Sequence, residues 1–210
     1  MLTVIYTMGL RGDLDLLPRL YTFLQALRRT HQRDTEDWLL LDLGGSCDPD
    51  VWPCGITEGR STLIVLDAMG YDAANVEGVL SQASRDKLVG QVALALIDSA
   101  HPAALKGRYT LVHEAADKAN DLTIVVTPNN SLNVEQQILR LPALTRGEIG
   151  QVQLAQHPQD GWHIVESATH PIPPETIPDS VISGVVDYVR DEARYYEKRQ
   201  REPGNTPRNP

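Results

Sequence analysis

The sequence has only two cysteines in 210 residues, no long apolar run and fewer basic than acidic side chains. Two cysteines cannot build a disulfide scaffold or a four-thiolate zinc site. A membrane-spanning helix needs about 20 consecutive apolar residues, and no stretch of this chain approaches that length. With 28 acidic side chains against 19 basic ones, binding to nucleic acid or to an anionic membrane is not expected.

The first residues, 1–7, alternate as in a strand and lack the basic start and apolar stretch of a signal peptide. We therefore expect a cytoplasmic protein whose fold begins at residue 1. In a reducing compartment, Cys47 and Cys54 are expected to be two free thiols. A disulfide within their loop is the second interpretation, and a metal-binding pair is the third.

Apolar residues make up 41% of the chain, which is enough to bury a core. Strand and helix patterns alternate over the first hundred residues, and strand patterns dominate afterwards. Strands are predicted at 2–7, 38–43, 72–76, 92–97, 109–113, 122–126, 149–154 and 162–165, and helices at 16–27, 61–69, 79–88 and 179–199. This order predicts an α/β layered sandwich with mixed β-sheets flanked by helices.

The last helix is expected to pack through one apolar face at positions 181, 185, 188, 189, 193 and 196. An alternative is that its tyrosines present an aromatic face to a partner. Residues 1–197 are predicted to form a single domain, and residues 198–210 to be a disordered, polar, proline-rich tail.

In a layered α/β fold, ligands bind at the carboxyl ends of the strands. In this chain the corresponding segments are 8–12, 42–46, 75–78 and 127–130, and all of them are rich in glycine or asparagine. The sequence therefore predicts a ligand-binding site at these strand ends.

The order and spacing of these segments resemble the calcineurin-like metallophosphoesterases, in particular the 5′-nucleotidase branch. Residues 4–12 resemble the first strand of that family, and residues 40–46 resemble its Leu-Asp-Ala-Gly-Asp-Ser block. Residues 59–76 resemble the helix and strand before its Gly-Asn-His-Glu block, and 147–154 resemble its closing hairpin. The likeness covers most of residues 3–170 and implies a metallophosphoesterase-like fold, which in the family surrounds two divalent metals.

The residues that hold these metals in the family are replaced at every block. Gly9 and Arg11 stand where the first block has Asp and His, and Gly45 stands at the second Asp of the next block. Residues 77–80 occupy the place of the Asn-His pair, and 127–130 that of the Gly-His-Thr-His block. The resemblance therefore implies the scaffold without its metal ligands.

Arg11 is a permanent cation among glycines, which suggests a metal-free anion site. The candidate anion-binding residues are Gly9, Arg11, Gly12, Gly44, Gly45, Ser46, Asn129 and Asn130. The guanidinium and free backbone N–H groups would bind a phosphate or a nucleotide. We favour the plainer alternative, in which Arg11 pairs with Asp13, Asp42 or Glu77 and fills the former metal cavity.

No cofactor is expected, and Asp42, Asp48 and Glu77 are only weak metal candidates. The sequence predicts a catalytically degenerate metallophosphoesterase-like domain that acts as a binding or regulatory module. Its expected partners are a small anion or nucleotide, another protein, or a second copy of the chain. The alternative is an active hydrolase of phosphate esters or nucleotides whose divalent metals have relocated ligands. It requires at least three of Asp13, Asp42, Asp48, Glu77, Asp98, His101 and His113 to converge on one point.

Overall fold

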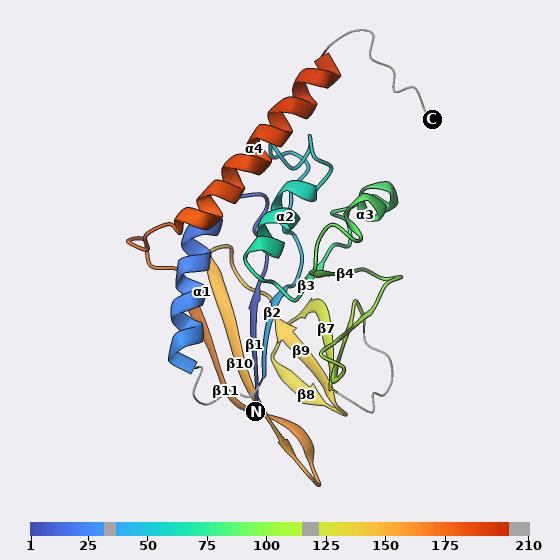
Figure 1. Ribbon diagram of the computed structural model, residues 1–210. Coiled ribbons are helices and arrows are strands. Elements are labelled where there is room, and N and C mark those ends of the chain that lie inside the picture. The colour runs from blue at the N-terminus through green and yellow to red at the C-terminus, as the bar shows by residue number, and fades with distance from the viewer. Residues whose placement is uncertain (32–36, 115–121, 202–210) are drawn as a thin grey trace.

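The computed structural model describes residues 1–31, 37–114 and 122–201 as two stacked β-sheets with helices along one of them (Figure 1). The first sheet has six strands in the order β11-β10-β1-β2-β3-β4, and the second has five in the order β5-β6-β7-β9-β8. Both sheets combine parallel and antiparallel pairs. The predicted α/β sandwich with mixed sheets flanked by helices is confirmed.

The first sheet positions the candidate site. Its parallel strands are β1 (Leu2–Thr7), β2 (Asp37–Asp42), β3 (Ala73–Asn75) and β4 (Ala95–Ile97), and the antiparallel pair β10 (Glu148–His157) and β11 (Gly161–Pro171) joins it at β1. Successive side chains of β1 serve two cores, because Val4 packs toward the second sheet and Ile5 packs toward the helices. The continuous apolar run of β2 is explained by burial on both faces, because Leu39 packs in one core and Leu40 in the other.

The second sheet consists of β5 (Ala103–Leu105), β6 (Tyr109–Val112), β7 (Leu122–Asn129), β8 (Asn133–Glu135) and β9 (Ile138–Pro142). The strands β5, β8 and β9 were not predicted from the sequence. Two of these have three residues each, too few for an alternating pattern to be recognised. Arg140 interrupts the apolar run of the third.

The helices are α1 (Leu17–His31), α2 (Arg60–Ala68), α3 (Gln82–Leu88) and α4 (Ser180–Arg201). Side chains of α1, α2 and α4 share a core with the helix-facing side of the first sheet. In the part of the chain that the structure describes, no helix has the length and apolarity to cross a membrane.

The predicted packing face of α4 was right at Val189 and Ala193 and wrong at Val181 and Tyr188. The helix buries Ile182, Val186, Val189 and Ala193, which follow one another at intervals of three or four residues. Val181 and Tyr188, which were assigned to the packing face, are 71% and 63% exposed. The predicted set combined two neighbouring apolar stripes of one helix, and only the packed sheet shows which stripe is buried.

The boundary expected at residue 198 also differs, because α4 continues to Arg201. Residues 198–201 are therefore helical. The rest of the predicted tail, 202–210, lies outside the described residues.

The two cysteines form a disulfide, so the expectation of two free thiols was wrong. The loop after β2 turns back on itself and brings the Cα atoms of Cys47 and Cys54 to 5.6 Å across a separation of seven residues. That distance lies within the range that a disulfide bridges without backbone movement. Cytoplasmic location remains a prediction.

Candidate functional site

The loops after β1 and β2 lie side by side and are joined by a ladder of backbone hydrogen bonds. The N–H groups of Gly9, Arg11 and Gly12 donate to the carbonyls of Gly44, Gly45 and Ser46 over 2.9, 2.8 and 2.8 Å. The structure therefore brings together six of the eight candidate anion-binding residues. These three N–H groups already have partners, however, so the expected cradle of free backbone donors does not form from them.

Gly12 shows how closely the first loop approaches the disulfide. Its φ angle is +78°, and a Cβ atom at this position would lie less than 3.0 Å from Sγ of Cys54. Glycine is required here both by the backbone conformation and by the lack of space. The disulfide thus supports the first loop directly.

Arg11 pairs with Asp48 and not with any of the three acids proposed from the sequence. Its Nε atom donates to Oδ2 of Asp48 over 3.0 Å, and its Nη2 atom contacts the same oxygen. The side chain of Arg11 is 64% exposed. This hydrogen bonding lowers the pKa of Asp48 below its ordinary value. The guanidinium therefore lies at the surface and does not fill an interior cavity.

Asp42 is the acid that lies deepest at the strand ends. It is fully buried, and its carboxyl oxygens accept hydrogen bonds from the N–H of Gly44 at 3.2 Å and from Oγ1 of Thr7 at 3.3 Å. The Tyr71 hydroxyl lies 3.0 Å from the same Thr7 oxygen. Burial raises the pKa of Asp42 to about 8, and the two hydrogen bonds offset only part of that effect. Asp42 is therefore largely uncharged at neutral pH.

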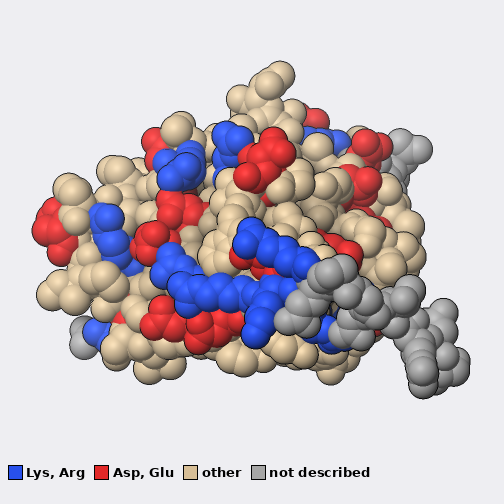
Figure 2. All heavy atoms as spheres, turned by 90° about the horizontal axis from the view of Figure 1, so that it is seen from above, with Lys and Arg blue, Asp and Glu red and all other residues tan. Residues whose placement is uncertain are grey.

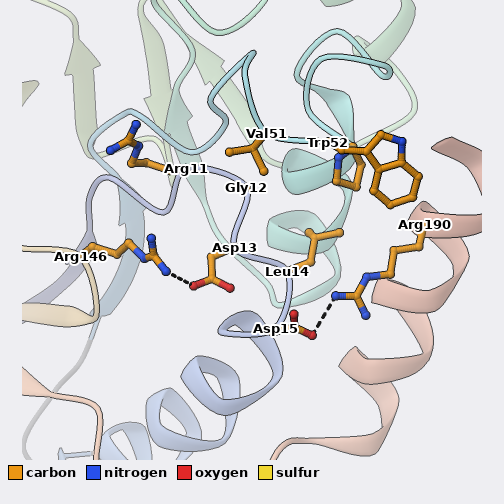
Figure 3. A pocket seen from close by; sticks show the side chains of 10 residues that line it. Arg11, Gly12, Asp13, Leu14, Asp15, Val51, Trp52, Arg146 and Arg190 are labelled. Carbon is orange, nitrogen blue, oxygen red and sulfur yellow. Dashed lines mark hydrogen bonds and ion pairs between the residues drawn. The ribbon is translucent and has the colours of Figure 1, made fainter. Parts of the chain in front are cut away.

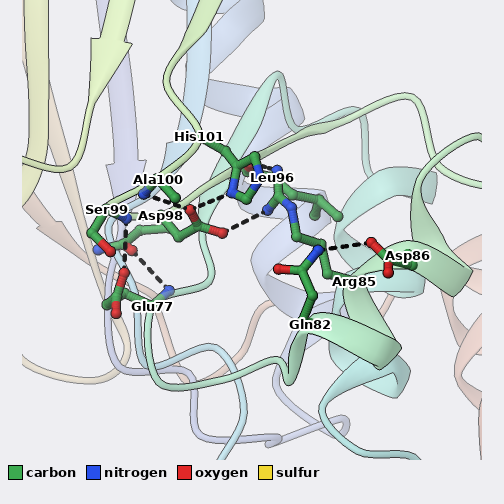
Figure 4. A network of polar contacts seen from close by, with 10 residues as sticks. Glu77, Gln82, Arg85, Asp86, Leu96, Asp98, Ser99, Ala100 and His101 are labelled. Carbon is green, nitrogen blue, oxygen red and sulfur yellow. Dashed lines mark hydrogen bonds and ion pairs between the residues drawn. The ribbon is translucent and has the colours of Figure 1, made fainter.

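The remaining acids near the strand ends belong to a separate polar network (Figure 4). Oε2 of Glu77 accepts the N–H of Ser99 over 2.8 Å, and this bond lowers the pKa of Glu77. Asp98 contacts Nδ1 of His101 at 2.6 Å and Nη1 of Arg85 at 3.0 Å. These carboxylates brace the chain after β3 and β4.

The side chains present do not fit the two-metal centre that the resemblance implies. Within residues 1–31, 37–114 and 122–201, no three His, Cys, Asp or Glu side chains are grouped so that they could hold a metal ion. Asp42 is buried with a raised pKa, Asp48 is bound to Arg11, and Glu77 is bound to Ser99. The three weak metal candidates thus have different partners and do not converge on one point.

Asn129 and Asn130 lie at the end of β7, in the second sheet. The side-chain amide of Asn129 donates to the carbonyl of Ser131 over 3.2 Å, and its Cα partner is Pro142 of β9. The contacts of Asn129 are therefore local, in contrast to the ladder that joins the six other candidates.

A pocket of about 540 Å³ opens beside the first loop (Figure 3). Its wall includes Arg11, Trp52 from the disulfide loop, Arg146 from the turn before β10 and Arg190 from α4. Three arginines and a tryptophan thus line this pocket.

Each arginine of this pocket also contacts a carboxylate. Arg146 binds Asp13, and Nη2 of Arg190 lies 2.8 Å from Oδ1 of Asp15. Figure 2 looks down on this end of the molecule and shows basic and acidic side chains interleaved on the surface. The pocket wall therefore includes three arginines and two aspartates, and Asp48, the partner of Arg11, is not part of the wall.

Trp52, Arg146 and Arg190 were not predicted from the sequence as site residues. They come from a loop, a turn and a helix that are far apart in the chain, and no local motif connects them. One feature of the sequence could have indicated Trp52 as a site residue. It lies between the two cysteines, in the loop that follows the second predicted strand.

No protein-family model matches the sequence, and no curated protein matches it. Solved structures do match the fold. A 5′-nucleotidase precursor from Thermus thermophilus aligns with a TM-score of 0.66 and 8% identity over 92% of this chain and 59% of its own.

Two further matches are the NAD nucleotidase NadN of Haemophilus influenzae and the sulfate thiohydrolase SoxB of Thermus thermophilus. Their TM-scores are 0.58 and 0.59, with 8% and 10% identity over 92% of this chain. The chain spans only about 60% of the length of these neighbours. The fold is therefore that of the metallophosphoesterase-like domain of 5′-nucleotidases.

Proposed function

We propose that this chain is a metallophosphoesterase-like domain that lacks the two-metal centre and binds a small anionic ligand. The proposal rests on the observation that the acidic side chains near the strand ends lie apart from one another and have different partners. Asp42 is buried and hydrogen-bonded to Gly44 and Thr7, while Asp48 and Glu77 are held by different partners. A binuclear site needs several oxygen or nitrogen donors around a common point, because metal–ligand distances are about 2.0–2.6 Å.

The pocket of Arg11, Trp52, Arg146 and Arg190 is the proposed binding site. A guanidinium has five N–H donors, so an arginine can keep its carboxylate partner and still bind a phosphate or carboxylate. The indole of Trp52 offers a flat face to an aromatic group. A nucleotide combines both features, and the names NAD nucleotidase and 5′-nucleotidase of two structural neighbours support this ligand class.

The binding experiment compares AMP, inorganic phosphate and uncharged adenosine by isothermal titration calorimetry, with Trp52 fluorescence as a second signal. AMP is expected to bind more tightly than phosphate, and adenosine more weakly than either. Arg146→Gln and Arg190→Gln are each expected to weaken AMP binding about tenfold or more, because a charge-assisted hydrogen bond is lost. Arg108→Gln removes an arginine of an exposed ion pair on the second sheet and is the matched control. Equal binding by all three variants and the original protein would refute the pocket.

A second experiment tests the loss of metal chemistry. The purified protein is analysed for Mn, Fe, Zn, Ca and Mg, and is assayed on phosphate monoesters, diesters and nucleotides with and without chelator. We expect no stoichiometric transition metal and AMP binding that is insensitive to chelator. Stoichiometric metal together with turnover that chelator abolishes would overturn the proposal in favour of the active hydrolase.

A further inference from the structure

The disulfide lies against the first turn of α2. Oγ1 of Thr62 is 3.1 Å from Sγ of Cys47 and 3.7 Å from Sγ of Cys54. Oγ of Ser61 is 3.9 Å from Sγ of Cys47. The sulfur atoms of a disulfide carry no proton, so the hydroxyl groups are the donors in these contacts. Hydroxyl donors and the N-terminal end of a helix both stabilise negative charge on sulfur, which is the charge that appears when a disulfide opens.

Both cysteines line a second pocket, of about 270 Å³. It shares no wall residue with the pocket of Arg11, Trp52, Arg146 and Arg190, here called the arginine pocket. The disulfide is otherwise nearly covered, since Cys47 is 7% exposed and Cys54 is 1% exposed. A small dithiol that enters the second pocket therefore meets the disulfide without entering the arginine pocket.

The loop between the two cysteines forms part of the arginine pocket. Its contributions to the wall are Val51, Trp52 and Pro53. Its Asp48 holds the guanidinium of Arg11. In the part of the chain that the structure describes, the backbone–backbone hydrogen bonds of residues 48–53 stay within residues 48–57. The disulfide at the ends of the loop and the pair of Arg11 with Asp48 therefore fix the loop in the pocket wall.

Gly12 connects the disulfide to the other loop of the pocket. A Cβ atom on Gly12 would lie less than 3.0 Å from Sγ of Cys54, so the first loop occupies the space beside that sulfur. When an S–S bond opens, its sulfur atoms separate from bonding distance to van der Waals contact. Cys54 cannot move toward Gly12 without displacing the first loop, and a movement the other way displaces the loop that carries Trp52. Both movements change the wall of the arginine pocket.

We propose that the disulfide of Cys47 and Cys54 is a reversible redox switch for the arginine pocket. The oxidised form holds the pocket in its binding conformation, and reduction by a dithiol weakens the binding of the anionic ligand. This inference rests on the proposed function for the identity of the ligand, whereas the release of the two loops on reduction is independent of it.

Reduction proceeds by thiol–disulfide exchange. A thiolate of the dithiol attacks Sγ of Cys47, the more exposed of the two, and Cys54 leaves as a thiolate. The second sulfur of the dithiol then attacks the first within the mixed disulfide, and Cys47 leaves in turn. The dithiol gives up two electrons and becomes a disulfide, and its two protons pass to the cysteines. Thr62 lies beside both leaving sulfur atoms and donates to each.

The first experiment measures AMP binding by isothermal titration calorimetry to the oxidised protein and to protein reduced with dithiothreitol. The reduced form is expected to bind AMP about fivefold more weakly or worse, because a smaller fraction of it has the binding conformation. The Cys47→Ser/Cys54→Ser variant should bind like the reduced form and should not respond to dithiothreitol. Equal affinity of the two forms, with two thiols counted by maleimide labelling after reduction, would overturn the switch and leave the proposed function intact.

The second experiment follows the loops without any ligand, by amide hydrogen exchange and mass spectrometry. Reduction is expected to speed exchange about tenfold or more in residues 48–57 and 9–12, and to leave residues 149–154 of β10 unchanged. Unchanged exchange in both loops would refute the switch. Failure of the oxidised protein to bind AMP would instead refute the proposed function, so the two failures are distinguishable.

The part played by Thr62 is tested by the rate of reduction. Thr62→Val removes the hydroxyl beside both sulfur atoms and is expected to slow reduction by dithiothreitol about threefold or more. Thr30→Val is the matched control, because it removes a hydroxyl of α1 that donates to the carbonyl of Ala26 over 3.1 Å, and it should leave the rate unchanged. Equal rates for both variants would overturn the assignment of Thr62 as the donor to the leaving sulfur.

Discussion

The interior at the strand ends and the pocket surface above it, here called the rim, differ in how they accommodate charged side chains. The interior contains Asp42, whose burial raises its pKa to about 8. The rim contains Arg11, Arg146 and Arg190, each within hydrogen-bonding distance of an aspartate. The buried carboxyl group thus tends to stay protonated, because water does not solvate its charge. The exposed arginines keep their charge and pair with aspartates. Neither region supplies the converging charged donors of a metal centre.

The largest loss of stability is expected on substitution of Gly12, which lies where the rim meets the interior. Gly12→Ala would place a methyl group less than 3.0 Å from Sγ of Cys54 at a φ of +78°, and the disulfide cannot move aside easily. The free energy of unfolding should fall by about 3 kcal/mol or more. Gly9→Ala is the matched control, because its φ is +65° but nothing lies within 4 Å of its Cβ. It should cost about 1 kcal/mol. Urea unfolding measures both, and equal losses would show that the disulfide does not confine the loop.

The second-largest effect on stability is expected at Asp42, the buried acid. The pKa of Asp42 is raised from 3.8 to about 8 in the folded protein. Between these values the unfolded chain releases the proton while the folded protein retains it, so the stability falls as pH rises from about 4 to 8. Asp42→Asn keeps the shape without the ionisation. We expect a flatter pH profile, because the amide does not ionise between pH 4 and 8. A profile that keeps its slope would show that Asp42 is not buried as an acid.

The smallest effect on stability is expected at the rim. Asp13→Asn removes the carboxylate that pairs with Arg146, in a contact that is partly exposed on both sides. Exposed ion pairs contribute about 0.2–1 kcal/mol, so thermal unfolding should hardly change. AMP binding should strengthen severalfold, because Arg146 loses a competing anion. A loss of more than 2 kcal/mol in unfolding free energy, about twice the usual limit, would place this pair in the structural core instead.

The sequence was most informative where burial imposes a pattern. The alternating pattern at 1–7 and the continuous apolar run at 38–43 predicted strands, and the structure has them at Leu2–Thr7 and Asp37–Asp42. The glycine-rich segments after both strands were correctly placed side by side at one end of the sheet. Short strands such as β8 were missed because three residues carry no periodicity.

The site was less predictable, because its contacts join residues that are distant in the chain. Arg11 was correctly placed in the loop after β1, yet its partner proved to be Asp48, which the disulfide loop carries. The backbone N–H groups that were expected to bind an anion are used by the second loop. Loop conformation depends on such contacts and not on local propensity, which is why composition and spacing could not specify it.

What the sequence determined by itself is the layered α/β scaffold, since the strand and helix patterns depend on residue type and order. What only the tertiary structure decided is where charge and apolar surface remain accessible. It paired Cys47 with Cys54, placed Arg146 and Arg190 around one pocket, and left Tyr188 exposed on α4. The physical reason is that burial and pairing are properties of contacts between distant segments, and these contacts exist only after the chain has folded.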